Sequence, residues 1–375
     1  MNPHVELNSD SDKDDSLLFT LSGVNVSLAN AVRRTILSDI PSVVFKTAPY
    51  EENKANIIAN TTRLNNEILK QRLSCIPIHI KNTDDFPLKN YILEVNVENI
   101  TDTTMYVTTK DFVIKDVVSG KPISESKIRE IFPANDYTGY FIDFARLRPK
   151  VSDELPGEKI NLTCELSIST AKVDGMFNAV STCSYGFTID TVAQDALLEK
   201  HKQTWKDEGK NEAEVKFEVK NWKLLDGLRI TKKDSFDFTI QSVGVYTNYE
   251  LVNKACAILI EKLDELDTLI EKDELRIDKS MNTMANSFDI ILENEDYTIG
   301  KILEYFLYTK FYETKTLTFC GFKKMHPHDS DSIIRVAYKD AIEKATIKGN
   351  LKECIEEAKQ VFGKIKKEFL RFVKN

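Results

Sequence analysis

A short pattern that occurs near both ends of the chain constrains its fold more than any other sequence feature. Residues 25–30 (NVSLAN) and 296–301 (DYTIGK) both run from an Asn or Asp through a Ser or Thr to an aliphatic and a small residue. Each segment opens a helical pattern that lies between two predicted strands. Ser27 is expected to cap the first helix, because a hydroxyl can accept from a free backbone N–H there. The chain is therefore predicted to contain two copies of one strand–helix–strand module.

Both modules end in a long amphipathic helix, one at residues 249–272 and one at the C-terminus. The apolar stripes are wider than one small sheet needs, so each helix is expected to pack on a helical partner. Two copies of a module suggest a pseudo-two-fold pairing inside the chain, an intramolecular pseudo-dimer. Capped strand–helix–strand units are common, however, and the pattern by itself leaves a chance likeness open. The residues expected at the internal interface are Val252, Leu259, Leu263, Leu266, Ile299, Leu303, Ile355, Phe362 and Phe369.

The middle of the chain differs from its ends and consists of many short alternating runs separated by turn signals. We therefore predict an α+β fold in which a mainly β domain is inserted into the first module. The expected parts are a disordered acidic tail (1–15), the first dimerisation module (16–46 and 187–272, with a charged helical excursion at 191–235), the inserted domain (47–186), a linker (273–287) and the second module (288–375).

Charge and cysteine content exclude several functions. The chain has 375 residues and a formal net charge of -8, from 59 acidic and 51 basic residues. Strong direct binding of nucleic acid usually requires a basic face, so it is not expected. No run approaches the ~20 apolar residues of a membrane helix, and the chain is expected to be intracellular. None of the six cysteines forms a C-x-x-C pair, so no metal or cofactor is expected.

Two longer segments carry a family resemblance. Residues 19–41 (FTLSGVNVSLANAVRRTILSDIP) and 60–78 (NTTRLNNEILKQRLSCIPI) resemble the two linked motifs of the bacterial RNA polymerase alpha subunit and its relatives. Those relatives are the archaeal D subunit and the third-largest subunit of eukaryotic RNA polymerase II. Residues 294–300 and 322–327 resemble their smaller partner, the archaeal L subunit and the eleventh subunit of polymerase II. Residues 238–244 look like the strand that returns to the larger module.

This resemblance implies a non-catalytic subunit of a multisubunit DNA-directed RNA polymerase that acts as an assembly platform. Its implied partners are the largest and second-largest polymerase subunits and small polymerase subunits. The fusion of both subunit types in one chain resembles the arrangement in nucleocytoplasmic large DNA viruses. That resemblance implies viral transcription, in the host cytoplasm at a viral factory or in the virion.

The resemblance also implies which residues face the large subunits. Arginine suits such a surface because its planar guanidinium binds carboxylates through two hydrogen bonds. A solvated helix face is the alternative for the arginine pair, and a local helical ion pair is the alternative for Arg63 and Glu67. The candidate partner-facing residues are Asn30, Arg33, Arg34, Asn60, Arg63, Glu67 and Arg72.

Other features argue against chemistry in this chain. Relatives often carry a four-cysteine site in the inserted domain, whereas this one holds only Cys75, Cys164 and Cys183. His326 and His328 flank a proline without a third ligand nearby, which indicates a rigid turn. No convergent acid–base, nucleophile or metal set is found, so an enzyme is not expected. A free oligomerising interaction protein without polymerase association is the alternative function.

Overall fold

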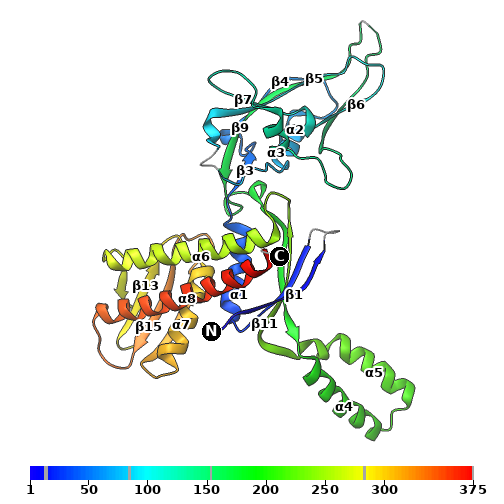
Figure 1. Ribbon diagram of the computed structural model, residues 1–375. Coiled ribbons are helices and arrows are strands. Elements are labelled where there is room, and N and C mark those ends of the chain that lie inside the picture. The colour runs from blue at the N-terminus through cyan, green and yellow to red at the C-terminus, as the bar shows by residue number, and fades with distance from the viewer. Residues whose placement is uncertain (12–15, 83–85, 153, 282–283, 374–375) are drawn as a thin grey trace. The chain divides into compact units, whose positions relative to one another are not determined.

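The computed structural model describes residues 1–11, 16–82, 86–152, 154–281 and 284–373. The chain forms two compact units (Figure 1). The first unit consists of Met1–Ile36, Thr182–Gln241 and Asn248–Asn375. The second unit consists of Leu37–Ser181 and Ser242–Thr247. The second unit is thus inserted into the first.

The first unit begins with a four-stranded sheet in the order β1-β2-β11-β10. Its strands are β1 (His4–Ser11), β2 (Ser16–Ser22), β10 (Val180–Ile189) and β11 (Thr231–Ser242). Side chains along β2 alternate between buried and partly exposed, as expected for a sheet that covers a core on one face. Phe19 of β2 stacks on Phe238 of β11 with ring centroids 5.0 Å apart and meets Phe369 edge-on at 4.9 Å.

A second sheet in the first unit has the order β12-β13-β15-β14. Its strands are antiparallel: β12 (Ile277–Lys279), β13 (Ser287–Leu292), β14 (Leu317–Lys323) and β15 (Ser332–Tyr338). The helices of the first unit's two modules are α1 (Val26–Ser38), α6 (Asn248–Glu271), α7 (Tyr297–Leu307), with a π-helical turn at Tyr308–Tyr312, and α8 (Lys344–Val373).

The two modules start their first helices in the same way. The Asn25 Oδ1 atom accepts a hydrogen bond from the Ser27 backbone N–H at 2.9 Å. The Asp296 Oδ1 atom accepts one from the Thr298 N–H at 2.8 Å. The capping group is therefore the Asn or Asp side chain, and the prediction that the Ser27 hydroxyl caps the helix was wrong. The carboxamide or carboxylate instead accepts from the N–H of the Ser or Thr two residues further along the chain.

Two predicted irregular segments contain strands. His4–Ser11 is not disordered but pairs antiparallel with β2 as β1, because Val5 supplies a buried apolar side chain among polar residues. Residues 12–15 of the predicted tail lie outside the described residues. The predicted linker contains β12, which pairs with β13 through the buried Ile277. Residues 282–283 of that linker also lie outside the described residues.

The second unit is mainly β, with its central strand β9 (Lys159–Ser169) in a five-stranded sheet. Two helices, α2 (Asn66–Ser74) and α3 (Glu125–Ile131), belong to the same unit. Four phenylalanines at Phe45, Phe112, Phe132 and Phe144 form its aromatic core. The remaining strands are β3 (Ser42–Phe45), β4 (Ala55–Asn60), β5 (Tyr91–Glu98), β7 (Val113–Asp116), and the separate pair β6 (Met105–Thr108) and β8 (Asp143–Leu147).

The boundaries between the units differ from those we predicted. Strand β3 was assigned to the first module, yet it pairs with β9 in the second unit. Strand β10 begins inside the predicted inserted domain, yet it lies beside β11 in the first unit. The divisions fall after Ile36 and after Ser181. A local apolar pattern identifies a strand but does not reveal which distant strand it pairs with.

The predicted charged excursion is a helical hairpin between β10 and β11 (Figure 1). It consists of α4 (Thr191–Asp207) and α5 (Glu212–Leu224), and β11 begins at Thr231, earlier than predicted. The His201 ring lies 5.7 Å from the Trp205 ring and 5.5 Å from the Trp222 ring, measured between centroids. The two tryptophans thus pack inside the hairpin, as the sequence suggested.

Candidate interface site

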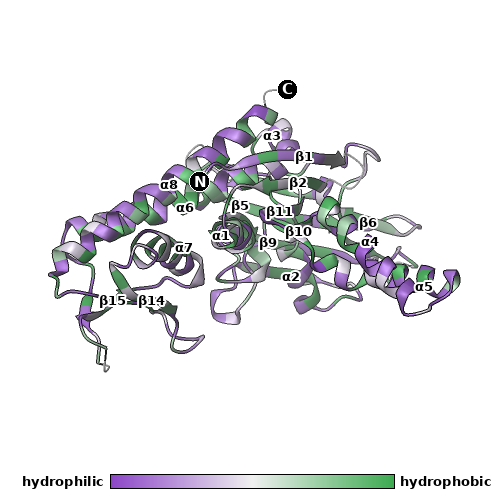
Figure 2. Ribbon diagram, turned by 90° about the horizontal axis from the view of Figure 1, so that it is seen from below, coloured by the Kyte–Doolittle hydropathy of each residue, from purple (hydrophilic) through white to green (hydrophobic). Residues whose placement is uncertain are grey.

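Helices α6 and α8 pack against each other in the first unit (Figure 1). We call β1, β2, α1, β10, β11 and α6 the N-terminal half of this unit, and residues 287–373 the C-terminal half. All nine residues predicted at the internal interface are buried, with at most 7% of any side chain exposed. Leu263 of α6 and Phe362 of α8 are fully buried. Figure 2 shows hydrophobic and hydrophilic residues interspersed along α8, as an amphipathic helix requires.

Ion pairs along the edge of this helix pair show that α6 and α8 run antiparallel. Lys359 Nζ lies 2.6 Å from Asp264 Oδ1. About two turns earlier on α8, Lys352 Nζ lies 2.9 Å from Glu271 Oε1, which is further along α6. Lys348 pairs with Asp273 just beyond the end of α6. As residue numbers fall on α8 they rise on α6, so the helices are antiparallel.

These pairs also shift the pKa values of their members. The hydrogen bond to Asp264 raises the pKa of Lys359 above the usual lysine range. The hydrogen bond to Glu271 likewise raises the pKa of Lys352, and the same bond lowers the pKa of Glu271. The bonds therefore favour the charged forms of Lys359, Lys352 and Glu271 at neutral pH. These charged residues were not predicted from the sequence, because the interface was expected from the apolar stripes alone.

Arg34 joins the two halves through a second polar contact. Its Nη2 atom lies 2.7 Å from Asp296 Oδ2, and its Nε donates to Thr298 Oγ1 at 2.9 Å. Asp296 thus caps α7 with one oxygen and binds Arg34 of α1 with the other. We predicted that Arg34 faces a separate partner. The structure shows its guanidinium bound within the chain's own interface, and a contact with a separate partner stays a prediction.

Arg33 and Asn30 remain on the partly exposed side of α1. Arg33 Nε donates to Asn30 Oδ1 at 3.0 Å, one turn earlier on the same helix. This hydrogen bond uses one of the five N–H donors of the guanidinium. The other donors give Arg33 the capacity for bidentate pairing that we expected of a partner contact.

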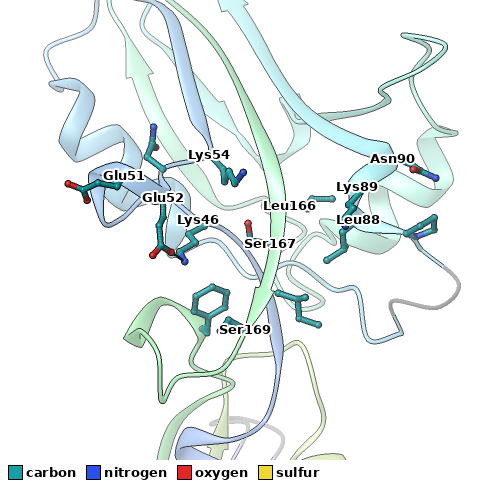
Figure 3. A pocket seen from close by; sticks show the side chains of 14 residues that line it. Lys46, Glu51, Glu52, Lys54, Leu88, Lys89, Asn90, Leu166, Ser167 and Ser169 are labelled. Atoms are coloured by element: carbon teal, nitrogen blue, oxygen red, sulfur yellow. Dashed lines mark hydrogen bonds and ion pairs between the residues drawn. The ribbon is translucent and has the colours of Figure 1, made fainter. Parts of the chain in front are cut away.

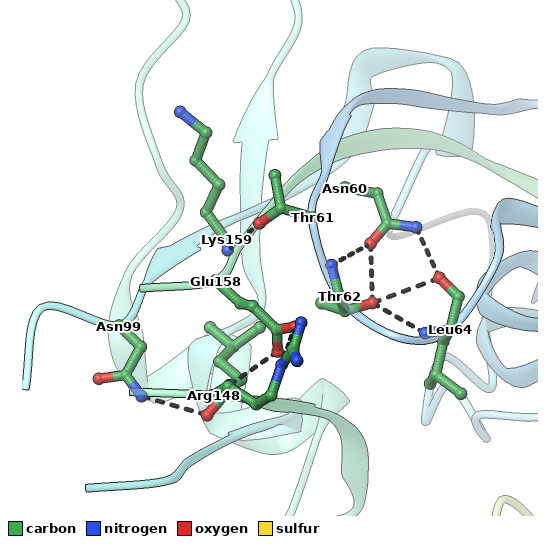
Figure 4. Close-up of polar contacts among 9 residues, drawn as sticks. Asn60, Thr61, Thr62, Leu64, Asn99, Arg148, Glu158 and Lys159 are labelled. Atoms are coloured by element: carbon green, nitrogen blue, oxygen red, sulfur yellow. Dashed lines mark hydrogen bonds and ion pairs between the residues drawn. The ribbon is translucent and has the colours of Figure 1, made fainter. Parts of the chain in front are cut away.

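Two of the second-unit candidates, Asn60 and Arg72, form hydrogen bonds that hold local structure. Asn60 Nδ2 donates to Leu64 O at 2.8 Å, and its Oδ1 accepts from the Thr62 N–H at 3.0 Å, which shapes the loop before α2 (Figure 4). Arg72 donates from Nε to Phe144 O and from Nη2 to Asp143 O, both at 2.7 Å. Asn60 and Arg72 thus have local roles in the second unit, and their contact with a partner stays a prediction.

Arg63 and Glu67 are exposed, but no ion pair joins them within the described residues. The reason is that α2 begins after Arg63, with Asn65 as the capping residue whose Oδ1 accepts from the Ile68 N–H at 2.8 Å. Arg63 therefore lies before the helix, and the spacing of four residues does not place it above Glu67.

A polar cluster close to this loop was not found from the sequence. Glu158 is buried, and its Oε1 atom lies 2.5 Å from Arg148 Nε while Oε2 accepts from the Arg148 N–H at 2.7 Å (Figure 4). Asn99 is fully buried and donates to Thr103 O and Leu147 O. Each buried polar atom in these contacts is satisfied, so the cluster stabilises the second unit.

A cavity in the second unit has a volume of about 860 Å³ (Figure 3). It opens beside residues 166–169, where β9 continues past the end of its pairing with β5. Lys46 forms an ion pair with Glu52 there. Neither a histidine nor a cysteine is among the described lining residues.

Across the ranges that the structure describes, no group of three or more His, Cys, Asp or Glu side chains is arranged to hold a metal ion. In the same ranges, no helix combines the length and apolarity needed to span a bilayer.

Comparison with known families gives two matches of the same kind. Residues 18–263 match the model of the RNA polymerase Rpb3/Rpb11 dimerisation domain. Residues 287–368 match a second model with the same description. The first match covers most of the N-terminal half together with the second unit, and the second covers nearly all of the C-terminal half. The two modules found from the repeat thus correspond to two dimerisation domains.

Individual relatives are RNA polymerase subunits. The DNA-directed RNA polymerases I and III subunit rpac1 of Dictyostelium discoideum is 25% identical over 297 residues, which cover 72% of this chain and 83% of the relative. Subunit Rpo3 of Picrophilus torridus is 24% identical over 276 residues, covering 68% and 95%. Subunit Rpo3 of Pyrococcus furiosus is 39% identical over 66 residues, covering 18% and 23%.

Proposed function

We propose, from the premise that the chain belongs to the RNA polymerase Rpb3/Rpb11 dimerisation family, that one polypeptide here supplies both members of a dimerisation pair. In this proposal the chain is the non-catalytic assembly platform of a DNA-directed RNA polymerase. The N-terminal half takes the place of the larger dimerisation subunit, and the C-terminal half takes the place of the smaller one.

The observation that carries this proposal is the presence of two dimerisation domains in one chain, with a shared buried layer between α6 and α8. Fusion keeps the two halves at an effective concentration of about mM, so their pairing does not depend on a bimolecular step. The relatives are subunits of RNA polymerases, which supports a polymerase as the larger complex.

We place the docking surface for the two large catalytic subunits around Asn30 and Arg33 of α1, with Arg63 and Glu67 as a second contact. What supports this choice is their exposure together with the motif resemblance of the segments that carry them. Arg34 is left out of the surface because it binds Asp296 within the chain. An isolated chain is then expected to have no nucleotidyl transfer activity.

The test of docking is the single variant Arg33→Glu in the full chain. Charge reversal at a contact with a carboxylate or backbone oxygen costs roughly 2–5 kcal/mol. Because about 1.4 kcal/mol is a tenfold change in affinity, co-purification with the two large subunits should fall at least tenfold. Thermal stability should change little, because Arg33 contacts only Asn30 among the polar bonds described. Lys216→Glu on the exposed face of α5 makes the same change of charge and serves as the control.

Normal assembly of the Arg33→Glu variant would remove α1 from the docking surface. Loss of assembly by both variants would instead indicate a nonspecific effect of charge. The double change of Arg33 and Arg34 is unsuitable here, because it also breaks the ion pair with Asp296.

We further propose that the chain serves a large DNA virus and acts at cytoplasmic viral factories or in the virion. The support is the resemblance of the fused arrangement to that of such viruses. Immunolocalisation in infected cells and protein analysis of purified virions test this proposal, and a purely nuclear distribution would contradict it.

A further inference from the structure

The two halves of the first unit are alike enough to be aligned residue by residue. A shift of 271 positions carries Ser16 to Ser287 at the starts of β2 and β13, and Asn25 to Asp296 at the starts of α1 and α7. A shift of 99 positions carries buried residues of α6 onto buried residues of α8. The pairs are Val252 and Leu351, Ala255 and Cys354, Cys256 and Ile355, Leu259 and Ala358, Leu263 and Phe362, Leu266 and Ile365, and Ile270 and Phe369.

Contacts around the first helices agree with this alignment. Arg34 of α1 lies at the start of α7, and the position equivalent to Arg34 on α7 is Tyr305. Burial and then the charge of Asp234 raise the pKa of Tyr305, so Asp234 lies near this tyrosine. The Asp234 carbonyl accepts from the Gly23 N–H at 2.8 Å, just before α1 begins. Each helix therefore approaches the start of the other, as a two-fold relation requires.

Similar apolar stripes create a choice of partner. A stripe that pairs α6 with α8 would also accept a second α6 or a second α8 from another copy of the chain. Hydrophobic burial is not directional, so it gives little preference among these pairings. Any preference for the unlike half must come from polar groups at the edge of the interface.

At each contact along the edge of this interface, a charge on one half faces the opposite charge on the other half. Acidic residues near the end of α6 face basic residues near the start of α8, whereas at the first helices the basic residue belongs to the N-terminal half. Five of the ion pairs between the halves are Lys359 with Asp264, Lys352 with Asp267 and with Glu271, Lys262 with Glu295, and Arg34 with Asp296.

The alignment shows what these residues would meet in a pairing of like halves. If a second α6 replaced α8, Asp264 would face Ile260 and Glu271 would face Asn253, so the acidic residues would lose their lysines. In a pairing of two α8 helices, Lys352 would face Lys366 at the position of Asp267.

The first helices behave in the same way. In a pairing of two N-terminal halves, Arg34 would face Asn25, which carries no charge, instead of Asp296. Like pairings thus lose the attractive contacts, and one of them gains a repulsive contact.

We infer that this charged edge selects the partner: it favours the unlike half of the same chain and disfavours pairing with a second copy. The inference rests on the proposed function, in which the two halves form an intramolecular pair. Each partly exposed ion pair contributes little to stability. Specificity, however, depends on the difference in free energy between the unlike and the like pairing, and each of these ion pairs favours the unlike pairing.

The experiment uses three variants of the full chain. The first carries Asp264→Lys and Glu271→Lys, the second carries Lys352→Glu and Lys359→Glu, and the third combines all four changes. At low salt we expect the melting temperature of the first two to fall by several degrees, because like charges then face each other. The combined variant should recover at least half of that loss, since its charges are again opposite.

A mixture of the first two variants tests the choice of partner directly. After joint refolding, the altered α6 of one chain and the altered α8 of the other are complementary, and so are the two unaltered helices. Light scattering should therefore show a 1:1 dimer in the mixture. The variant with all four changes should be a monomer. In 1 M salt, where the screening length is about 3 Å, the dimer should be strongly reduced.

Glu261→Lys with Glu265→Lys is the matched control, because it makes the same charge change on the exposed face of α6. Neither carboxylate forms an ion pair within the described part of the chain. If the control loses as much stability as the first variant, or the mixture contains only monomers, the edge does not select the partner. These measurements use the isolated chain, so they fail independently of the polymerase association.

Discussion

Asp289 and Arg335 lie directly opposite each other on β13 and β15, where their side chains form a two-bond ion pair. The hydrogen bonds from Arg335 hold the pKa of Asp289 below its usual range, and Ser280 donates a further bond. The folded state therefore prefers the ionised carboxylate more than the unfolded chain does. Its stabilising contribution is present at neutral pH and is lost as the pH falls through the lowered pKa.

We accordingly expect Asp289→Asn to lower the free energy of unfolding at pH 7 by about 1 kcal/mol, a value limited by the partial exposure of Arg335. The difference from the unaltered chain should shrink below about pH 4 and approach zero in stronger acid. Denaturant titrations at several pH values measure it. Asp340→Asn, at an exposed aspartate, should show no such dependence, and equal curves for both variants would contradict the role of the pair.

Single residues also differ in how well their roles could be predicted from the sequence. The buried positions of α6 and α8 could be predicted because helical periodicity is a local property. The role of Arg34 could not, because Asp296 lies 262 positions away and neither residue's neighbourhood indicates the other. The motif resemblance even assigned Arg34 to an external partner.

At the scale of elements, the α4–α5 hairpin is separable from the sheet that carries it. The Asp190 N–H donates to Ile230 O at 3.0 Å, so the two ends of the hairpin already lie side by side. Its internal packing comes from its own side chains, including His201 between Trp205 and Trp222.

Replacing residues 192–228 with a two-residue turn should therefore leave the melting temperature within a few degrees of the original value. Calorimetry of the shortened chain measures this. Replacing strand β2 (Ser16–Ser22) with the same two-residue turn should prevent folding and serves as the comparison. A shortened chain that fails to fold would show that the hairpin stabilises the sheet.

Element boundaries were the least predictable part of the fold. The strand at residues 42–45 was recognised from its apolar run, but its partner β9 lies more than a hundred residues away. The short β12 was missed because three residues with one buried side chain give little periodic signal. Both depend on contacts between distant segments, which a local pattern does not contain.

At the scale of the whole molecule, the chain matches the Rpb3/Rpb11 dimerisation domain twice, once at residues 18–263 and once at 287–368. Because both domains belong to one polypeptide, they are always present in a 1:1 ratio. We propose that the charged edge between α6 and α8 protects that stoichiometry by disfavouring a second copy.

The most direct test is the copy number of this chain in the native polymerase, purified through a tag on the chain and measured by quantitative mass spectrometry. We expect one copy for each copy of the two largest subunits, and no separate polypeptide of either dimerisation type. Two copies of the chain, a separate small dimerisation subunit, or the absence of the large subunits would contradict the proposal that one polypeptide forms the whole platform.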